Sequence, residues 1–89
     1  MSVYVDSPLF AFGGRKMCHM IADTEAELYQ MADKLKLNRA WVQHNKILHF
    51  DLSVHKREQA IRLGALPVDH AVLVRVMRRL KGGKDGSQG

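Results

Sequence analysis

Histidines and aspartates of this chain stand at or near the ends of short apolar segments. Asp6 and Asp23 each follow such a segment, and His49 precedes Asp51 by two positions. Residues two apart lie on the same side of an extended strand, so His49 and Asp51 are expected to face the same way. Ligand sites of α/β proteins gather at strand ends. We therefore expect these imidazoles and carboxylates to converge.

His19 lies inside an apolar segment, where a buried imidazole needs a hydrogen-bond partner. One interpretation is a core histidine that an aspartate or a backbone carbonyl satisfies. The other groups His19, His49 and Asp51, with Asp6 or Asp23, as ligands of a divalent metal ion. Such an ion would lower the pKa of a bound water and let it attack a phosphodiester. His19, His49 and Asp51 are thus the candidate metal-binding and catalytic residues.

A second group of chemical interest begins at Ser53, a natural N-cap for a helix. The N–H groups at a helix N-terminus bind anions, and Lys56 and Arg57 would add positive charge there. The alternative is an ordinary solvated helix face. Arg15, which follows two glycines, could supply a bidentate clamp for a phosphate or a carboxylate.

Basic residues are concentrated near the C-terminus of a chain whose net charge is +5. Arg75, Arg78 and Arg79 are spaced three and four apart, so they share one side of a helix. They either form a solvated face or contact nucleic acid electrostatically. Aromatic residues are missing from this segment, which weakens a role in stacking on single strands.

The length and composition of the chain limit its class. Its 89 residues suffice for one domain with a thin core. No apolar run approaches the roughly 18 residues of a membrane span, and the start lacks the pattern of a signal peptide. We therefore expect a cytoplasmic protein without membrane contact. Cys18, the single cysteine, has apolar neighbours and is expected to be a buried structural thiol.

Periodicity and capping residues predict the elements that must position these side chains. Thr24 followed by Glu27 is a capping box, and Asn45-Lys46 suits a hairpin turn. Trp41 is expected in the core. In order, the sequence predicts a strand over 3–5, a loop over 7–16, a strand over 17–21, a helix over 24–36, a hairpin of 41–44 with 47–50, a helix over 53–64, an edge strand over 65–68 and a helix from 69.

The order of these elements favours a single α/β domain over residues 1–81, followed by a disordered tail over 82–89. We expect a small mixed sheet of about four to five strands covered by three helices. A passage from strand to helix to strand implies a right-handed crossover. The apolar loop with Leu9, Phe10 and Phe12 would fold back over the core or present a partner-binding tip.

Several segments together resemble domain-of-unknown-function family 4031, small proteins of bacteria and their phages. The resemblance covers about residues 3–66 and brings no assigned activity. Phe50 departs from it, because the family usually has tyrosine there, and the approach to Met17 is shorter. The segments that carry it are Val3-Tyr4-Val5-Asp6, Met17-Cys18-His19-Met20-Ile21-Ala22-Asp23-Thr24, Glu27-Leu28, Met31-Ala32, Trp41 with Gln43, His49-Phe50-Asp51, Lys56-Arg57 and Gly64-Ala65. The polar positions that it implies are Asp6, Arg15, His19, Asp23, Gln43, His49, Asp51, Lys56 and Arg57.

Three functions remain open from the sequence. The leading hypothesis is a module that binds a phosphate-bearing ligand, either nucleic acid or a nucleotide, at the strand ends. The second is a metal-dependent phosphodiesterase or nuclease, with a divalent metal as its cofactor. The third is an interaction module that acts on a host protein through the apolar loop. The ligand-binding candidates are Asp6, Arg15, Asp23, Gln43, Lys56 and Arg57, beside the catalytic and metal candidates His19, His49 and Asp51 and the nucleic-acid candidates Arg75, Arg78 and Arg79.

Overall fold

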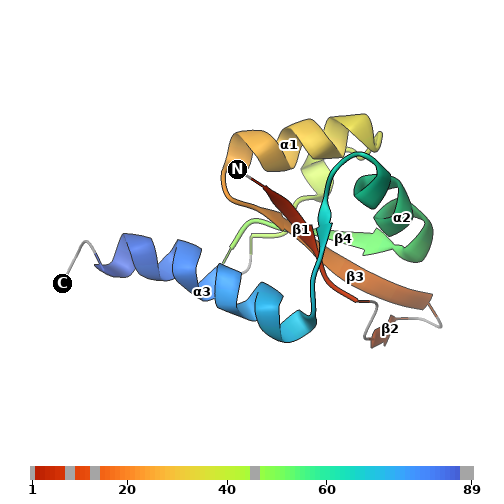
Figure 1. Cartoon of the computed structure of the whole chain (residues 1–89). Coiled ribbons are helices and arrows are strands. Elements are labelled where there is room, and N and C mark those ends of the chain that lie inside the picture. The colour runs from red at the N-terminus through yellow and green to blue at the C-terminus, as the bar shows by residue number, and fades with distance from the viewer. Residues whose placement is uncertain (1, 8–9, 13–14, 45–46, 87–89) are drawn as a thin grey trace.

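The computed structural model describes residues 2–7, 10–12, 15–44 and 47–86, and it leaves the side chains of 10–12, 15 and 81–86 undescribed. Figure 1 shows the arrangement of the elements. In chain order these are β1 (Val3–Val5), β2 (Phe10–Phe12), β3 (Arg15–Ala22), α1 (Glu25–Lys34), the 3-10 helix η1 (Arg39–Trp41), β4 (Phe50–Ser53), α2 (Val54–Arg62), β5 (Leu66–Pro67) and α3 (His70–Gly86).

The long strand β3 organises a five-stranded mixed sheet. Met20 pairs with Val5 of β1 and with Phe50 of β4, so these two strands flank β3. Met17 is likewise paired with β2 and with β4. Hence β1 and β2 lie one after the other along one edge of β3, and β4 lies along the other edge. β5 runs parallel to β1 at the outer side of the sheet, and the other pairings are antiparallel.

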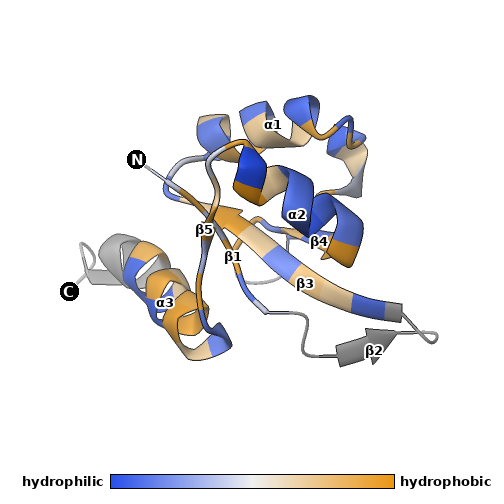
Figure 2. Ribbon diagram, turned by 45° about the vertical axis from the view of Figure 1, so that its right-hand side comes forward, coloured by the Kyte–Doolittle hydropathy of each residue, from blue (hydrophilic) through white to orange (hydrophobic). Residues whose placement is uncertain are grey.

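Each face of the sheet is covered by its own helices. Figures 1 and 2 show α1 and α2 on one face and α3 on the other. Cys18 and Met20 belong to the core beneath α1 and α2, whereas Ile21 packs with Leu73 and Val76 of α3. Because side chains alternate along a strand, His19 points to the same face as Ile21, the face that α3 partly covers. The fold class predicted from the sequence is confirmed.

The helix ends follow the predicted capping chemistry. The Thr24 hydroxyl accepts a hydrogen bond from the Glu27 N–H at 3.2 Å, and the Ser53 hydroxyl accepts one from the Lys56 N–H at 3.2 Å. α2 ends before Gly64. The φ of this residue is 112°, a value that glycine adopts without strain and that other residues rarely adopt. Since Ser53 also closes β4, the polar residues of that strand lead directly into the start of α2.

Some boundaries differ from those expected. The loop predicted over 7–16 is wrong at 10–12 and at 15–16, because Phe10–Phe12 form β2 and β3 begins at Arg15. Among the described residues, the hairpin is reduced to one bridge between Gln43 and His49, and the strand that follows pairs with β3. Its expected turn at 45–46, like Leu9 of the predicted loop, lies outside the described residues.

Other expectations hold only in part or fail. The passage from β3 through α1 to β4 makes no crossover, because β4 lies antiparallel to β3, but β4 and β5 run parallel in one sheet and are joined by a crossover through α2. Trp41 is 60% exposed in η1, so it is not part of the core. α3 continues to Gly86, past the position where we expect a tail to begin, and residues 87–89 lie outside the described part of the chain.

Candidate functional site: an imidazole and carboxylate cluster

Asp6 forms the centre of a polar cluster at the point where β1 leaves β3. Its side chain bonds to β3 where the strand pairing of β1 ends. Oδ1 of the carboxylate accepts a hydrogen bond from the backbone N–H of His19 at 2.7 Å. Its own N–H donates to the His19 carbonyl at 3.2 Å, which extends the ladder by one residue. The side chain is only 1% exposed. A buried carboxylate needs hydrogen bonds or a counter-charge, and Asp6 has several.

Two imidazole rings share the second oxygen of Asp6. Oδ2 lies 2.9 Å from Nδ1 of His19 and 3.0 Å from Nδ1 of His70, the first residue of α3. A carboxylate can only accept hydrogen bonds, so Nδ1 of each ring carries a hydrogen. Asp6 therefore sets both the orientation and the tautomer of the two rings, as carboxylates do for catalytic and metal-binding histidines.

His49 and Asp51 extend the cluster along β4. Asp51 is paired with His19 across the β3–β4 ladder, so both side chains point to the face of the sheet that carries α3. The ring centroids of His49 and His19 are 5.7 Å apart. Nδ1 of His49 donates to the Ile47 carbonyl at 3.0 Å, and Nε2 lies 3.8 Å from Oδ1 of Asp51. The predicted grouping of His19, His49 and Asp51 is thus close in space.

The cluster is accessible to solvent at the N-terminal end of α3. The side chain of His70 is 46% exposed, that of Asp51 38% and that of His19 27%, around the buried carboxylate. His70 lies one turn before Leu73, which covers Ile21, so the apolar contact of α3 ends where the polar cluster begins. The rings of His19 and His70 are therefore held by the buried carboxylate of Asp6 and remain accessible to a ligand from solvent.

Arg57 brings a positive charge to this cluster. Its Nε donates to the backbone carbonyl of Asp6 at 2.7 Å, linking α2 to the end of β1. An open hollow of about 400 Å³ lies beside it, and Ser7 and Asp69, the chain neighbours of Asp6 and His70, contribute to its lining. The guanidinium group is thereby fixed at the rim of the cluster.

Electrostatic effects within the cluster favour an ionised Asp6 and a protonated His19. Burial alone raises the pKa of Asp6, but the hydrogen bonds from the His19 ring, the His19 N–H and His70 bring it below the ordinary 3.8. The hydrogen bond to Asp6 raises the pKa of His19 above the ordinary 6.5 against the effect of burial, and the charges of Asp6 and Asp51 add to the rise. The ion pair stabilises both charged forms.

Other predicted site residues are not brought to this cluster. Asp23 lies four residues further along β3 from His19, roughly 13 Å away at the rise of a strand. It accepts hydrogen bonds from the Ser2 N–H at 2.9 Å, the Tyr4 hydroxyl at 3.1 Å and Arg79 at 3.2 Å. Its contacts fix the start of β1 and the middle of α3, which is a structural role.

Lys56 and Gln43 have structural contacts as well. Nζ of Lys56 donates to the Leu35 carbonyl at 2.7 Å and so caps the end of α1. Gln43 is exposed and pairs through its backbone with His49, at 2.8 and 3.1 Å. Arg15 opens β3, but its side chain lies outside the description, so its predicted role as a clamp stays a prediction.

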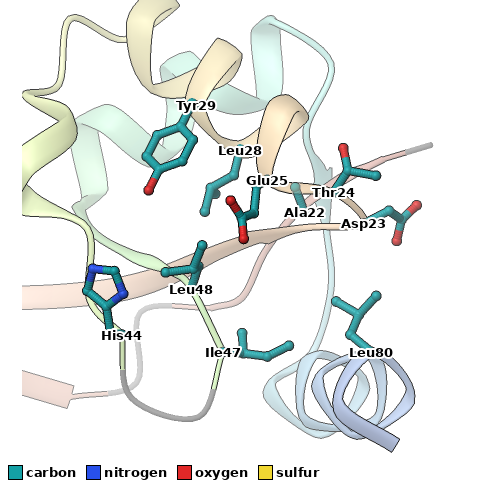
Figure 3. Close-up of a pocket in the computed structure, with 10 residues that line it drawn as sticks. All are labelled: Ala22, Asp23, Thr24, Glu25, Leu28, Tyr29, His44, Ile47, Leu48 and Leu80. Atoms are coloured by element: carbon teal, nitrogen blue, oxygen red, sulfur yellow. The ribbon is translucent and has the colours of Figure 1, made fainter. Parts of the chain in front are cut away.

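A larger hollow of about 540 Å³ lies at the C-terminal end of β3, beside Ala22 and Asp23. Figure 3 shows the apolar side chains of Leu28, Ile47 and Leu48 between His44 on one side and Asp23 on the other. None of the clustered imidazoles lines it. Size alone would favour this hollow, but the concentration of oriented polar groups favours the cluster around Asp6.

The predicted basic face and the predicted buried thiol can both be placed. Arg75, Arg78 and Arg79 are exposed on α3, and Arg79 also bonds Asp23. Nucleic-acid contact through them stays a prediction.

Cys18 is fully buried, and burial together with the charges of Asp6 and Asp51 raises the pKa of its thiol to about 12 despite Arg57. Its interpretation as a structural thiol is supported.

His70 is the residue of the cluster that sequence reasoning missed. It directly follows Asp69, where the sequence predicts the start of the last helix. The signal was nevertheless present, because a histidine just after a short strand meets the same criterion that selected Asp6. What was lacking was the parallel pairing of β5 with β1, which places the end of β5 beside the end of β1.

Comparisons with known proteins agree with the resemblance described above. A model of the family described as "Protein of unknown function (DUF4031)" matches residues 3–80 of the chain. No curated protein matches, and no solved structure matches either. The matched region includes the whole cluster from Asp6 to His70. Among the residues that the structure describes, no helix is long and apolar enough to cross a membrane.

Proposed function

Because the chain belongs to the DUF4031 family of unknown function, we propose from the geometry of the site that it binds a phosphate-bearing ligand, a nucleotide or a nucleic acid end. One observation carries the proposal. The rings of His49 and His70 lie 5.7 and 6.0 Å from the ring of His19, although the three residues come from separate segments. Nδ1 of each ring is already used for a hydrogen bond within the protein, so a protonated ring can donate from Nε2 to a phosphate oxygen.

The surroundings of these rings support an anionic ligand. Arg57 is fixed at the rim, and α3 begins at His70, so the positive end of its dipole lies at the cluster. The negative charge of Asp6 is already offset by the N–H groups that it accepts. The open hollow beside Arg57 offers room for the rest of a ligand.

Fluorescence polarisation with labelled nucleotides and short oligonucleotides, in a buffer with chelator, tests the proposal. We expect saturable binding that weakens steeply with salt, because phosphates release counterions when they are neutralised. His70→Gln should weaken it about tenfold or more, as expected when a hydrogen bond to a charged group is lost. His55→Gln, at an exposed position on α2, is the matched control and should stay within about twofold.

A second variant separates this site from the basic face of α3. The double variant Arg75→Gln and Arg78→Gln removes two exposed charges away from the cluster. It should leave nucleotide binding intact, whatever it does to long oligonucleotides. Nucleotide binding that depends on these arginines and not on His70 would contradict the proposal, as would the absence of binding at low salt.

Hydrolysis of a phosphodiester is the second candidate. The pair of His49 Nε2 and Asp51 Oδ1, 3.8 Å apart, favours it, because a carboxylate beside an imidazole supports proton transfer. Water would add to phosphorus and give its proton to one imidazole, while the ester P–O bond breaks and the leaving oxygen takes a proton from another. Release of a labelled product, lost in His49→Gln, is its test.

The third hypothesis, an interaction with a host protein through the apolar loop, stays a prediction. The side chains of Phe10 and Phe12 and the whole of Leu9 lie outside the description. A location in the cytoplasm is likewise a prediction from the sequence.

A further inference from the structure

We infer that Asp6, His19 and His70 form a site for one divalent metal ion of the zinc or cobalt class. The inference concerns the same cluster and deepens the proposed function, on which it rests for the ligand that such an ion would help to hold. One donor atom from each of these three residues lies within 4.8 Å of the other two. They differ from the set expected from the sequence, because His70 takes the place of His49 and Asp51.

The distances between donor atoms fit a coordination sphere. Oδ2 of Asp6 is 2.9 Å from Nδ1 of His19 and 3.0 Å from Nδ1 of His70. Metal–ligand bonds of about 2.0–2.1 Å place neighbouring ligand atoms about 2.9 Å apart in an octahedron and about 3.3 Å apart in a tetrahedron. The ligand atoms of the two rings lie within 4.8 Å of each other, so movement of the half-exposed His70 side chain would close the three ligands around an ion.

The charge of the site also suits a cation. The hydrogens on Nδ1 of His19 and of His70 offset the negative charge of the buried Oδ2 of Asp6. An ion at their centre would replace both hydrogens, satisfy the same carboxylate and release protons to solvent. The protonated cluster thus presents the arrangement that the ion would adopt, with Asp6 held in place by the His19 N–H at 2.7 Å.

The number and type of ligands indicate which ions fit. Two imidazoles and one carboxylate favour zinc, cobalt and related first-row ions over magnesium and calcium, which prefer oxygen. Three protein ligands leave positions open, as in catalytic zinc sites. His70 and His19 are partly exposed, so an open position would face solvent, where a phosphate oxygen of the proposed ligand could bind. Cys18 cannot compete, because it is buried on the other side of the sheet.

Calorimetric titration of the chelator-stripped full chain with Zn²⁺ alone, without phosphate ligand, tests the inference. We expect one ion per chain and a dissociation constant that rises tenfold or more in His70→Gln and in His19→Gln. Titration with Co²⁺ should give a visible absorption band that His70→Gln removes. His55→Gln, which also removes one imidazole, should bind both ions like the unaltered chain, and Mg²⁺ should not compete for the site.

Equal Zn²⁺ binding by the unaltered chain and by His70→Gln, or no stoichiometric binding at all, would overturn the metal site. His70 is half exposed, so thermal melting of its variant should confirm that the fold is kept. Phosphate binding is measured in chelator and metal binding without phosphate. Loss of one result therefore does not imply loss of the other, and the two failures can be told apart.

Discussion

Oδ2 of Asp6 lies 3.0 Å from Nδ1 of His70, although 64 positions separate the two residues in the chain. The contact exists because β5 pairs parallel to β1, so that the residues after both strands emerge together. It joins the end of the first strand to the start of the last helix. The site is therefore a property of the complete fold and of no single segment.

Asp6→Asn should destabilise the fold. An amide offers one acceptor and brings an NH₂ group against the N–H donors of His19 and His70, inside a buried environment. We expect the free energy of unfolding in urea to fall by about 2–4 kcal/mol. Asp33→Asn, which alters an exposed carboxylate paired with Arg39, is the control and should change the midpoint far less. A loss below about 1 kcal/mol for Asp6→Asn would contradict the central place of this carboxylate.

The stability of the metal-free chain should depend on pH through the same pair. The pKa of Asp6 is lowered by folding, so its contribution is present above about 3.8 and is lost as the pH falls through the folded-state pKa. The pKa of His19 is raised, so its contribution is present below 6.5 and is lost as the pH rises through the folded-state pKa. The pair thus contributes fully between these two values.

Urea midpoints measured across this range, in chelator, provide the check. His49, His70 and Asp51 also face His19, so the variant His19→Gln is the necessary comparison. Its midpoint should decline less than that of the unaltered chain as the pH rises above 6.5. Parallel curves for the two proteins would show that the imidazole of His19 does not couple to folding.

Lys56→Met should separate stability from ligand binding. The hydrogen bond from Nζ to the Leu35 carbonyl caps α1, and its loss should lower the free energy of unfolding by about 1 kcal/mol. Ligand binding should stay within about twofold, since the ammonium group points away from the cluster. Lys34→Met, at an exposed lysine of the same helix end, is the control. Strongly reduced binding with unchanged stability would restore the ligand-binding role expected from the sequence.

The Cys18 thiol should resist modification in the native protein. It is fully buried, and its pKa of about 12 leaves almost no thiolate at neutral pH. A chromogenic disulfide reagent should therefore react far more slowly with the folded chain than with the chain in urea. Equal rates in both conditions would mean that this part of β3 opens readily.

Local signals were sufficient for most elements and for part of the site. Thr24 and Ser53 marked two helix starts because capping depends on residues within one turn. The fold class followed from the order of apolar segments. His49 and Asp51 could be selected because strand ends collect polar residues, and His19 because a buried imidazole needs a polar partner. These inferences needed no knowledge of which strand lies beside which.

Features that depend on the pairing of segments far apart in the chain could not be predicted from the sequence. The pairing of β4 with β3, in place of the full hairpin expected between 41–44 and 47–50, depends on packing against the whole sheet. Lys56 suited an anion site by its position, but its long side chain reaches the end of α1 instead. Asp23 shared the strand-end criterion with Asp6, yet it lies beside the start of β1, whereas Asp6 follows the end of β1. His70 was missed because the two residues of β5 do not indicate that this strand pairs with β1.

The five histidines allow the most direct test of the site, because three belong to the cluster and His44 and His55 are exposed elsewhere. NMR spectra of the imidazole nitrogens should be recorded while a nucleotide is added in chelator. The rings of His19, His49 and His70 should shift together with a single dissociation constant, while the other two stay unchanged. Shifts of equal size at all five rings, or none at any of them, would contradict a phosphate site around Asp6.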